Sequence, residues 1–209
     1  MGKSVEVLGN VNGDVGSRSM LELFKRKLFK IIFWLFLLVA LPFTVLLLIG
    51  SQRFVYQAEI SISAPVEAIF PFLHQPSKIP LWQNGVQELK PIENDFNRPD
   101  HRAQLILALD ENDGKNGNNH SIPIVIKDIL PSTHLITDSE TSIFKSQTIW
   151  ELKTLEDHSV VRQEVVCFYS GVGRFLAPFM TSEAERQLQE DLWKLREVVE
   201  QQQGDSWFP

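Results

Sequence analysis

A run of twenty residues without a charge constrains this chain more than any other feature of its sequence. The run extends from Ile31 to Gly50, and fifteen of its residues are Leu, Ile, Val or Phe. At a rise of about 1.5 Å per residue, a helix of this length reaches about 30 Å, the thickness of a bilayer's hydrocarbon core. Pro42 bends such a helix without excluding it. The run predicts one membrane-spanning helix, between residues 28 and 51.

The flanks of this run predict how the chain is inserted. A signal peptide has an apolar region of about 7–15 residues and a small-x-small cleavage site, which Leu48–Ser51 lacks. We therefore expect a retained anchor. Four basic residues between 25 and 30 precede the run, and Arg53 alone closely follows it. Because flanking basic residues stay on the cytoplasmic side, we expect the N-terminus there and the C-terminal domain on the opposite face.

Residues 1–27 are predicted to be a disordered tail. Most of this segment is rich in Gly, Asn and Ser and has no periodic pattern, and its end is basic. An amphipathic helix over residues 21–29, lying on anionic headgroups, is the alternative explanation for its lysines.

The charge of the remaining chain excludes one class of partner. Residues 51–209 contain 14 Lys and Arg against 23 Asp and Glu, which leaves a formal charge of −9. A single domain of this size and negative charge lacks the basic surface that binds nucleic acid. It would contact lipid only through apolar surface. Cys167 is the only cysteine, so no disulfide forms within the chain and no thiolate metal site exists. We expect Cys167 to be a small buried apolar residue.

The alternation of polar and apolar residues predicts an α+β domain. Residues 54–62 alternate as a half-buried strand does, Pro65 starts a helix that ends near Leu73, and a short helix or turn follows at 76–82. Residues 110–121 are a solvated hairpin tip, because they lack the Gly and the Glu that a calcium loop needs at positions 6 and 12. Further strands are predicted at 86–92, 103–109, 122–130, 134–140, 146–155 and 159–169.

The last part of the domain predicts a long amphipathic helix. Ser182 to Glu185 fits a capping box, and Gly171–Pro178 before it fits a flexible connection. The apolar face of the helix consists of Ala184, Leu188, Leu192, Leu195 and Val199.

Three segments, in this order, match one known superfamily. They are Ile60–Phe70, a strand followed by Ala-Pro and a helix; Trp82–Val86, a Trp-x-x-Gly-Val element; and Gly173–Pro178 before the last helix. Together they resemble the START-like, or SRPBCC, superfamily, which includes polyketide cyclase/dehydrase, birch-pollen-allergen and coenzyme-Q-binding groups. The resemblance implies a helix-grip fold over residues 55–203, in which a curved antiparallel sheet surrounds the last helix, with 204–209 as a tail. It concerns the fold and not the activity.

The resemblance also implies an apolar cavity between sheet and helix, and one helical face alone cannot fill the concavity of a strongly bent sheet. Most candidate lining residues would serve as core. Trp82, Phe175 and Phe179 are favoured for function because they fall at segment ends, where an apolar opening would be exposed. The candidates are Phe72, Trp82, Leu105, Leu107, Ile124, Ile126, Trp150, Tyr169, Phe175, Phe179, Leu188 and Leu192.

The sequence offers no catalytic set, cofactor motif or metal site. Its five histidines have no ligand spacing, and P-loop, Gly-x-Ser-x-Gly and complete dinucleotide patterns are missing. Cyclase-type members of the superfamily use acid and base side chains in the cavity, for which Asp128, Arg162 and Glu164 are the candidates here. Alternation places Asp128 on the face of Ile124 and Ile126, whereas Arg162 and Glu164 fit an outward salt-bridge ladder.

These patterns favour a membrane-anchored binding protein for a hydrophobic small molecule such as a lipid, a quinone or an isoprenoid, without a cofactor or metal. Its partners would be the bilayer and that ligand, because a tether raises the effective concentration of a membrane-resident molecule. The alternatives are a cyclase or dehydratase that uses acid and base residues in the cavity, and an assembly factor that docks a membrane protein through Phe175–Met180.

Overall fold

The structure is a computed structural model that describes residues 15–93, 95–108 and 121–205. The first 14 residues of the expected tail, the predicted hairpin tip except Ser121, and residues 206–209 lie outside the described part. The chain forms two compact units, Met1–Leu46 and Leu47–Pro209, each of which is described by itself.

The described part of the first unit is one helix. Helix α1 extends over Val15–Gly50 and ends within the second unit. Residues 15–27, which we expected to be a disordered tail, are therefore helical where they are described. The segment Lys25–Gly50 is long and apolar enough to cross a membrane, and its most apolar window buries no residue within the structure.

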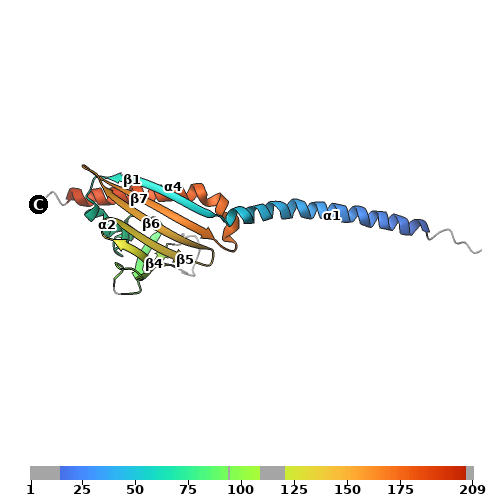
Figure 1. Cartoon of the computed structure of the whole chain (residues 1–209), viewed down its shortest axis with the longest axis horizontal. Coiled ribbons are helices and arrows are strands. Elements are labelled where there is room, and N and C mark those ends of the chain that lie inside the picture. The colour runs from blue at the N-terminus through green and yellow to red at the C-terminus, as the bar shows by residue number, and fades with distance from the viewer. Residues whose placement is uncertain (1–14, 94, 109–120, 206–209) are drawn as a thin grey trace, which may run out of the picture. The chain divides into compact units, whose positions relative to one another are not determined.

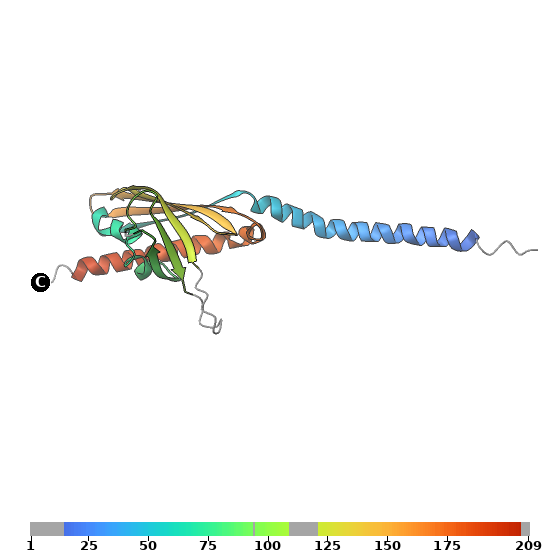
Figure 2. The same cartoon turned by 90° about the horizontal axis from the view of Figure 1, so that it is seen from below.

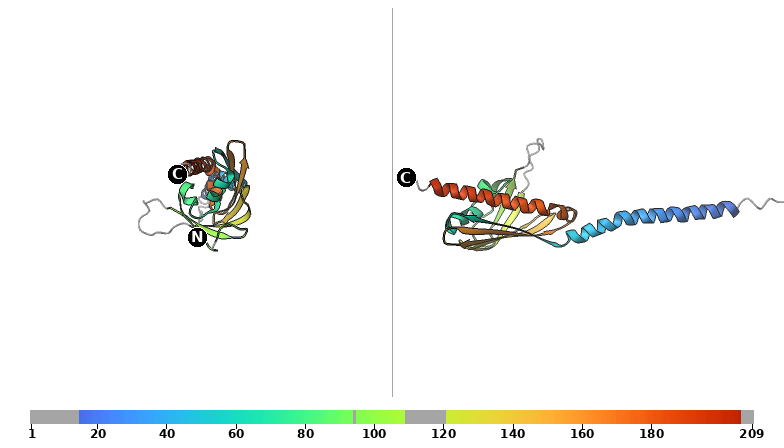
Figure 3. Two further views of the ribbon diagram at one scale, coloured as in Figure 1. Left: turned by 90° about the vertical axis from the view of Figure 1, so that its left-hand side faces the viewer. Right: turned by 90° about the horizontal axis from the view of Figure 1, so that it is seen from above.

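The second unit is built on one antiparallel sheet with the order β1-β7-β6-β5-β4-β3-β2. Helix α4 lies along the concave side of this sheet, which bends around it (Figures 1 and 2, and both views of Figure 3). The predicted helix-grip α+β fold is confirmed, and each predicted strand is present to within two residues. The strands are β1 Arg53–Ile62, β2 Val86–Pro91, β3 Arg102–Leu107, β4 Ser121–Leu130, β5 His134–Glu140, β6 Phe144–Thr154 and β7 Ser159–Tyr169; the helices are α2 Val66–His74, α3 Ile79–Trp82 and α4 Gly173–Asp205.

Helix α4 begins nine residues before the predicted capping box, so the predicted start at Ser182 is wrong. The segment Gly171–Pro178, expected to be a flexible connection, is helical from Gly173 onward, and Pro178 lies inside the helix. Ala177, which is fully buried, continues the inner face of Ala184 and Leu188 at a helical spacing of seven residues, and this longer-range period outweighs the local capping pattern.

A bulge in β4 changes the face on which Asp128 lies. The register shifts between Ile126 and Asp128, so Asp128 pairs with Ile136 of β5. The extra residue reverses the alternation: Ile126 is fully buried, whereas the Asp128 side chain is 58% exposed. The prediction that Asp128 shares the face of Ile124 and Ile126 is wrong for this reason.

The core fills one end of the concave sheet. Helix α4 contributes Leu192, Leu195 and Val199, which are fully buried. Trp82 of α3 lies edge-on to Trp150 at a centroid distance of 5.7 Å, and its indole N–H donates to the Phe72 carbonyl oxygen at 2.9 Å. Other fully buried members are Ile62, Ile69, Leu89, Ile126, Leu135 and Val161.

Adjacent residues of α4 give a test of this packing. Leu192→Ala should lower the free energy of unfolding by about 2–5 kcal/mol, because it leaves a cavity in a close-packed core. Trp193→Ala removes a larger side chain that is 61% exposed and should cost much less. Denaturant unfolding of the full chain in detergent measures both values, and equal costs would contradict the packing described here.

Candidate ligand-binding site

A cavity of about 330 Å³ lies between the concave face of the sheet and α4. Ligand pockets range over roughly 300–1,000 Å³, so this cavity is at the small end of that range. The sheet contributes residues from β1 and from β3 to β7, and α4 contributes Ala184, Gln187, Leu188 and Asp191. Phe144 and Tyr169, which pair across β6 and β7, lie at the end of the sheet where β7 stops.

A smaller cavity of about 80 Å³ shares part of the same wall. Gln83, Leu105, Ile124, Thr148 and Gln163 line both cavities, so the two form neighbouring parts of one site. The smaller part is lined in addition by both core tryptophans. The site therefore continues from the strand ends toward the packed core.

The structure brings together only some of the predicted lining residues. Those that line one or both cavities are Trp82, Leu105, Ile124, Trp150, Tyr169 and Leu188.

The other predicted residues lie elsewhere. Phe72, Ile126 and Leu192 are buried in the core, and Leu107 packs against it from the side. Phe175 and Phe179 line neither cavity, and Phe179 is 71% exposed on α4. Both residues lie more than one helical turn before Ala184, the first residue of α4 that lines the larger cavity, so they do not mark its opening.

Besides the predicted Tyr169, polar side chains that sequence analysis did not predict line the cavity. The hydroxyls of Tyr56 and Tyr169 lie 3.2 Å apart, and those of Ser139 and Ser146 lie 2.8 Å apart. Burial raises the pKa of Tyr169 well above its usual range and that of the Cys167 thiol to about 11. These groups are therefore neutral at physiological pH, and Cys167 is buried as expected.

Gln163 is the most unusual polar residue of the lining. Its side chain is only 5% exposed, and its Oε1 has no hydrogen-bond partner among the described residues. Of its neighbours across the sheet, Ala58 has no polar side chain, and the indole N–H of Trp150 does not donate to this oxygen. Such an unpaired buried acceptor costs about 1–3 kcal/mol. Alternation along β7, which puts Gln163 on the face of Val161 and Val165, was the signal that could have identified it.

Asp191 brings a carboxyl to the helix side of the cavity. It is 5% exposed, and its Oδ1 accepts the backbone N–H of Asn84 at 3.0 Å. Burial raises its pKa, against the opposing effects of that hydrogen bond and of Lys194. The spacing of Asp191 from Leu188 and Leu195, three and four residues away, could have placed it on the inner face of the helix.

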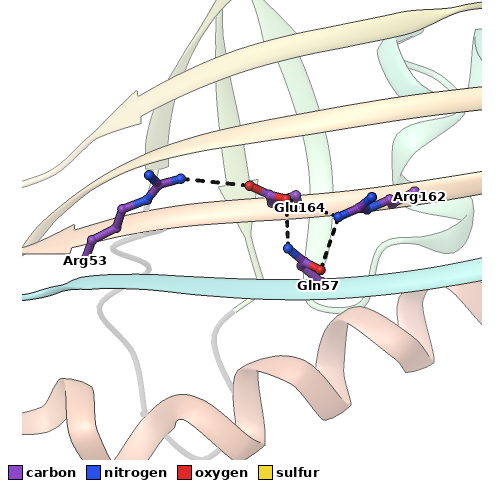
Figure 4. Close-up of polar contacts among 4 residues, drawn as sticks. All are labelled: Arg53, Gln57, Arg162 and Glu164. Carbon is purple, nitrogen blue, oxygen red and sulfur yellow. Dashed lines mark hydrogen bonds and ion pairs between the residues drawn. The ribbon is translucent and has the colours of Figure 1, made fainter.

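The acid and base residues that a cyclase would have used as cavity groups lie outside the cavity. Glu164 contacts Arg162 at 3.5 Å and accepts a hydrogen bond from Gln57 at 2.8 Å, on the outer face of β1 and β7 (Figure 4). Arg53 approaches the same carboxylate at 4.0 Å, so the predicted outward ladder is confirmed. Asp128 binds His134 at 2.8 Å, and neither residue lines the two cavities.

Over residues 25–93, 95–108 and 121–204, no group of three or more His, Cys, Asp or Glu side chains could hold a metal ion.

The raised pKa of Asp191 predicts how stability depends on pH. Its folded-state pKa lies above 3.8, so its contribution to stability is present below pH 3.8 and is lost as the pH rises through the folded value. Asp191→Asn does not titrate and keeps an oxygen for the Asn84 N–H. The variant should therefore be more stable than the wild type at pH 7, and this gain should shrink below pH 3.8. Denaturant unfolding at both pH values measures it; a less stable variant at pH 7 would contradict the effect of burial.

No protein-family model matches the sequence, and no curated protein matches it. Solved structures do match. Ara h 8.0201 is 14% identical with a TM-score of 0.56, and the match covers 71% of this chain and 98% of that protein. A START superfamily protein from Mycobacterium smegmatis is 15% identical with a TM-score of 0.56, over 70% and 97%.

A third structure is the di-domain ARO/CYC StfQ from the steffimycin biosynthetic pathway. It is 12% identical with a TM-score of 0.59, and the match covers 75% of this chain but only 53% of StfQ. At these identities the likeness concerns the fold. The second unit of this chain has the helix-grip fold of the START-like, or SRPBCC, superfamily.

Proposed function

We propose that this chain is a membrane-anchored binding protein whose helix-grip cavity takes up a hydrophobic small molecule. The observation that carries the proposal is the cavity of about 330 Å³ between sheet and helix. Apolar side chains such as Leu105, Ile124, Val165 and Leu188 form much of its wall. Its size favours a compact ring system or a single chain over a molecule with two long acyl chains.

The polar part of the wall supports binding over acid–base catalysis. Asp191 is the one carboxyl among the described residues of the larger cavity, and it is already hydrogen-bonded to the Asn84 N–H. The other polar lining groups are hydroxyls, amides and the Cys167 thiol. A cyclase mechanism needs a second group that titrates near neutral pH within reach of the first. Burial raises the pKa of Tyr56, Tyr169 and Cys167 away from neutrality, and the ladder lies on the outer face.

The short connection to α1 supports action at the membrane surface. Three peptide steps join Gly50 to the start of β1 at Arg53, which is at most about 10 Å. Within the second unit, Gly50 lies against the first turn of α4: a β-carbon built on it would come 1.7 Å from the Arg174 carbonyl oxygen. If residues 28–51 span a bilayer, the first turns of α4 are held at its surface.

These turns present an apolar stripe that suits this position. The stripe consists of Val172, Leu176, Phe179 and Met180, which are between 45% and 71% exposed. The acidic domain would be repelled by anionic headgroups elsewhere on its surface, so an apolar contact is the favourable one. We propose that the stripe rests in the bilayer interface, with the N-terminus cytoplasmic and the domain on the opposite face.

A pair of substitutions on β7 tests ligand binding. Val165→Trp fills the cavity, whereas Phe168→Trp changes a half-exposed residue that is not part of its lining. The full chain, extracted in detergent, should carry apolar molecules detectable by mass spectrometry. Val165→Trp should reduce the bound amount about tenfold, the equivalent of losing about 1.4 kcal/mol, and Phe168→Trp should not. A wild-type chain without bound apolar molecules would contradict the proposal.

Fluorophores on α4 test the membrane contact. In a Cys167→Ser background, Phe179→Cys and Glu197→Cys place the same label about 27 Å apart along the helix. In liposomes, spin-labelled lipids should quench the label at position 179 and leave the label at 197 unchanged. Unquenched fluorescence at 179 in the inserted chain would contradict the contact and favour docking of a protein partner there.

A further inference from the structure

The polar groups of the cavity differ in whether the protein itself satisfies them. The two tyrosine hydroxyls face each other, Ser139 and Ser146 pair across β5 and β6, and Asp191 accepts a backbone N–H. Gln163 Oε1 is the buried side-chain acceptor that remains without a partner among the described residues. Buried polar atoms in folded proteins are nearly always paired, so each exception needs an explanation.

The position of Gln163 indicates what its partner must reach. It lies in the wall that the two cavities share, together with Thr148 of the adjacent strand. Along β7, the six steps from Gln163 to Tyr169 span about 20 Å. A molecule with a polar end at Gln163 would therefore have its remaining length against Leu105, Ile124 and Leu188, toward the strand end.

We propose that the ligand is amphipathic and donates a hydrogen bond, from a hydroxyl or an N–H group, to Gln163 Oε1 at the inner end of the cavity. The inference rests on the proposed binding function and names the chemical class of its ligand. A carbonyl oxygen accepts hydrogen bonds and does not donate them. Alcohols, phenols, quinols and amides therefore fit this site, whereas hydrocarbons, ethers and oxidised quinones leave the acceptor unpaired.

Matched pairs of probes test this preference. We would use farnesol, 4-nonylphenol and cholesterol, each beside its methyl ether, which keeps the apolar body and removes the donor. Binding to the full chain in detergent is measured by competition against a fluorescent apolar probe. At least one alcohol should bind about three- to tenfold more tightly than its ether, the usual effect of one net hydrogen bond.

Two Gln→Met substitutions assign the preference to one residue. Gln163→Met keeps the length of the side chain and removes the acceptor, so it should abolish the difference between alcohol and ether while retaining ether binding. Gln147→Met is the control, because Gln147 lies on β6 and donates to Asp138 outside the larger cavity. It should leave the preference intact.

The outcomes separate this inference from the function on which it rests. If ethers and alcohols bind the wild type equally, or if Gln163→Met keeps the preference, the polar contact is refuted and the binding function stands. If none of the six probes binds, both are refuted.

Discussion

The structure depends on how the apolar face of α4 packs against the concave side of the sheet. The sheet is so strongly bent that one helix cannot fill its concavity. Leu192, Leu195 and Val199 close the gap at one end, where the two core tryptophans and α2 complete the packing. Toward the start of α4 the helix presents Ala184, Gln187 and Leu188, which leave the space open. Core and cavity are thus two ends of the same helix–sheet interface, and the sequence of α4 decides where one changes into the other.

The two faces of the sheet carry different kinds of polar residue. On the outer face, Arg53, Gln57, Arg162 and Glu164 contact one another in solvent (Figure 4), where such pairs contribute little to stability. On the inner face, polar residues are uncharged or held neutral by burial, as for Tyr169 and Cys167. On the sheet side the lining is therefore uncharged, and Asp191 of α4 is its one carboxyl; such a wall is compatible with an apolar molecule and still allows specific hydrogen bonds.

Much of the fold could be predicted because strand alternation and helical spacing are local and strong. Every strand was found, and so was the inner face of α4. The failures arose where a local signal competed with a longer-range one: Ser182–Glu185 resembles a helix start, yet the buried face of the helix extends back to Ala177. The bulge beside Asp128 could not be predicted, since it depends on how β4 pairs with β5. Gln163 and Asp191 were missed because the candidate lining consisted of apolar and aromatic residues, although the periodicity of these two residues places them inside.

The pairing of β1 with β7 has a consequence for how the chain is made. Tyr56 and Tyr169, which face each other in the finished domain, are 113 residues apart in the sequence. At a synthesis rate of about 5–20 residues per second, β1 waits roughly 5–20 seconds for β7, the strand beside it in the sheet. Throughout that interval β1 has an unpaired edge, which is the kind of surface that pairs with other chains, so the domain is open to misassembly until β7 has been made.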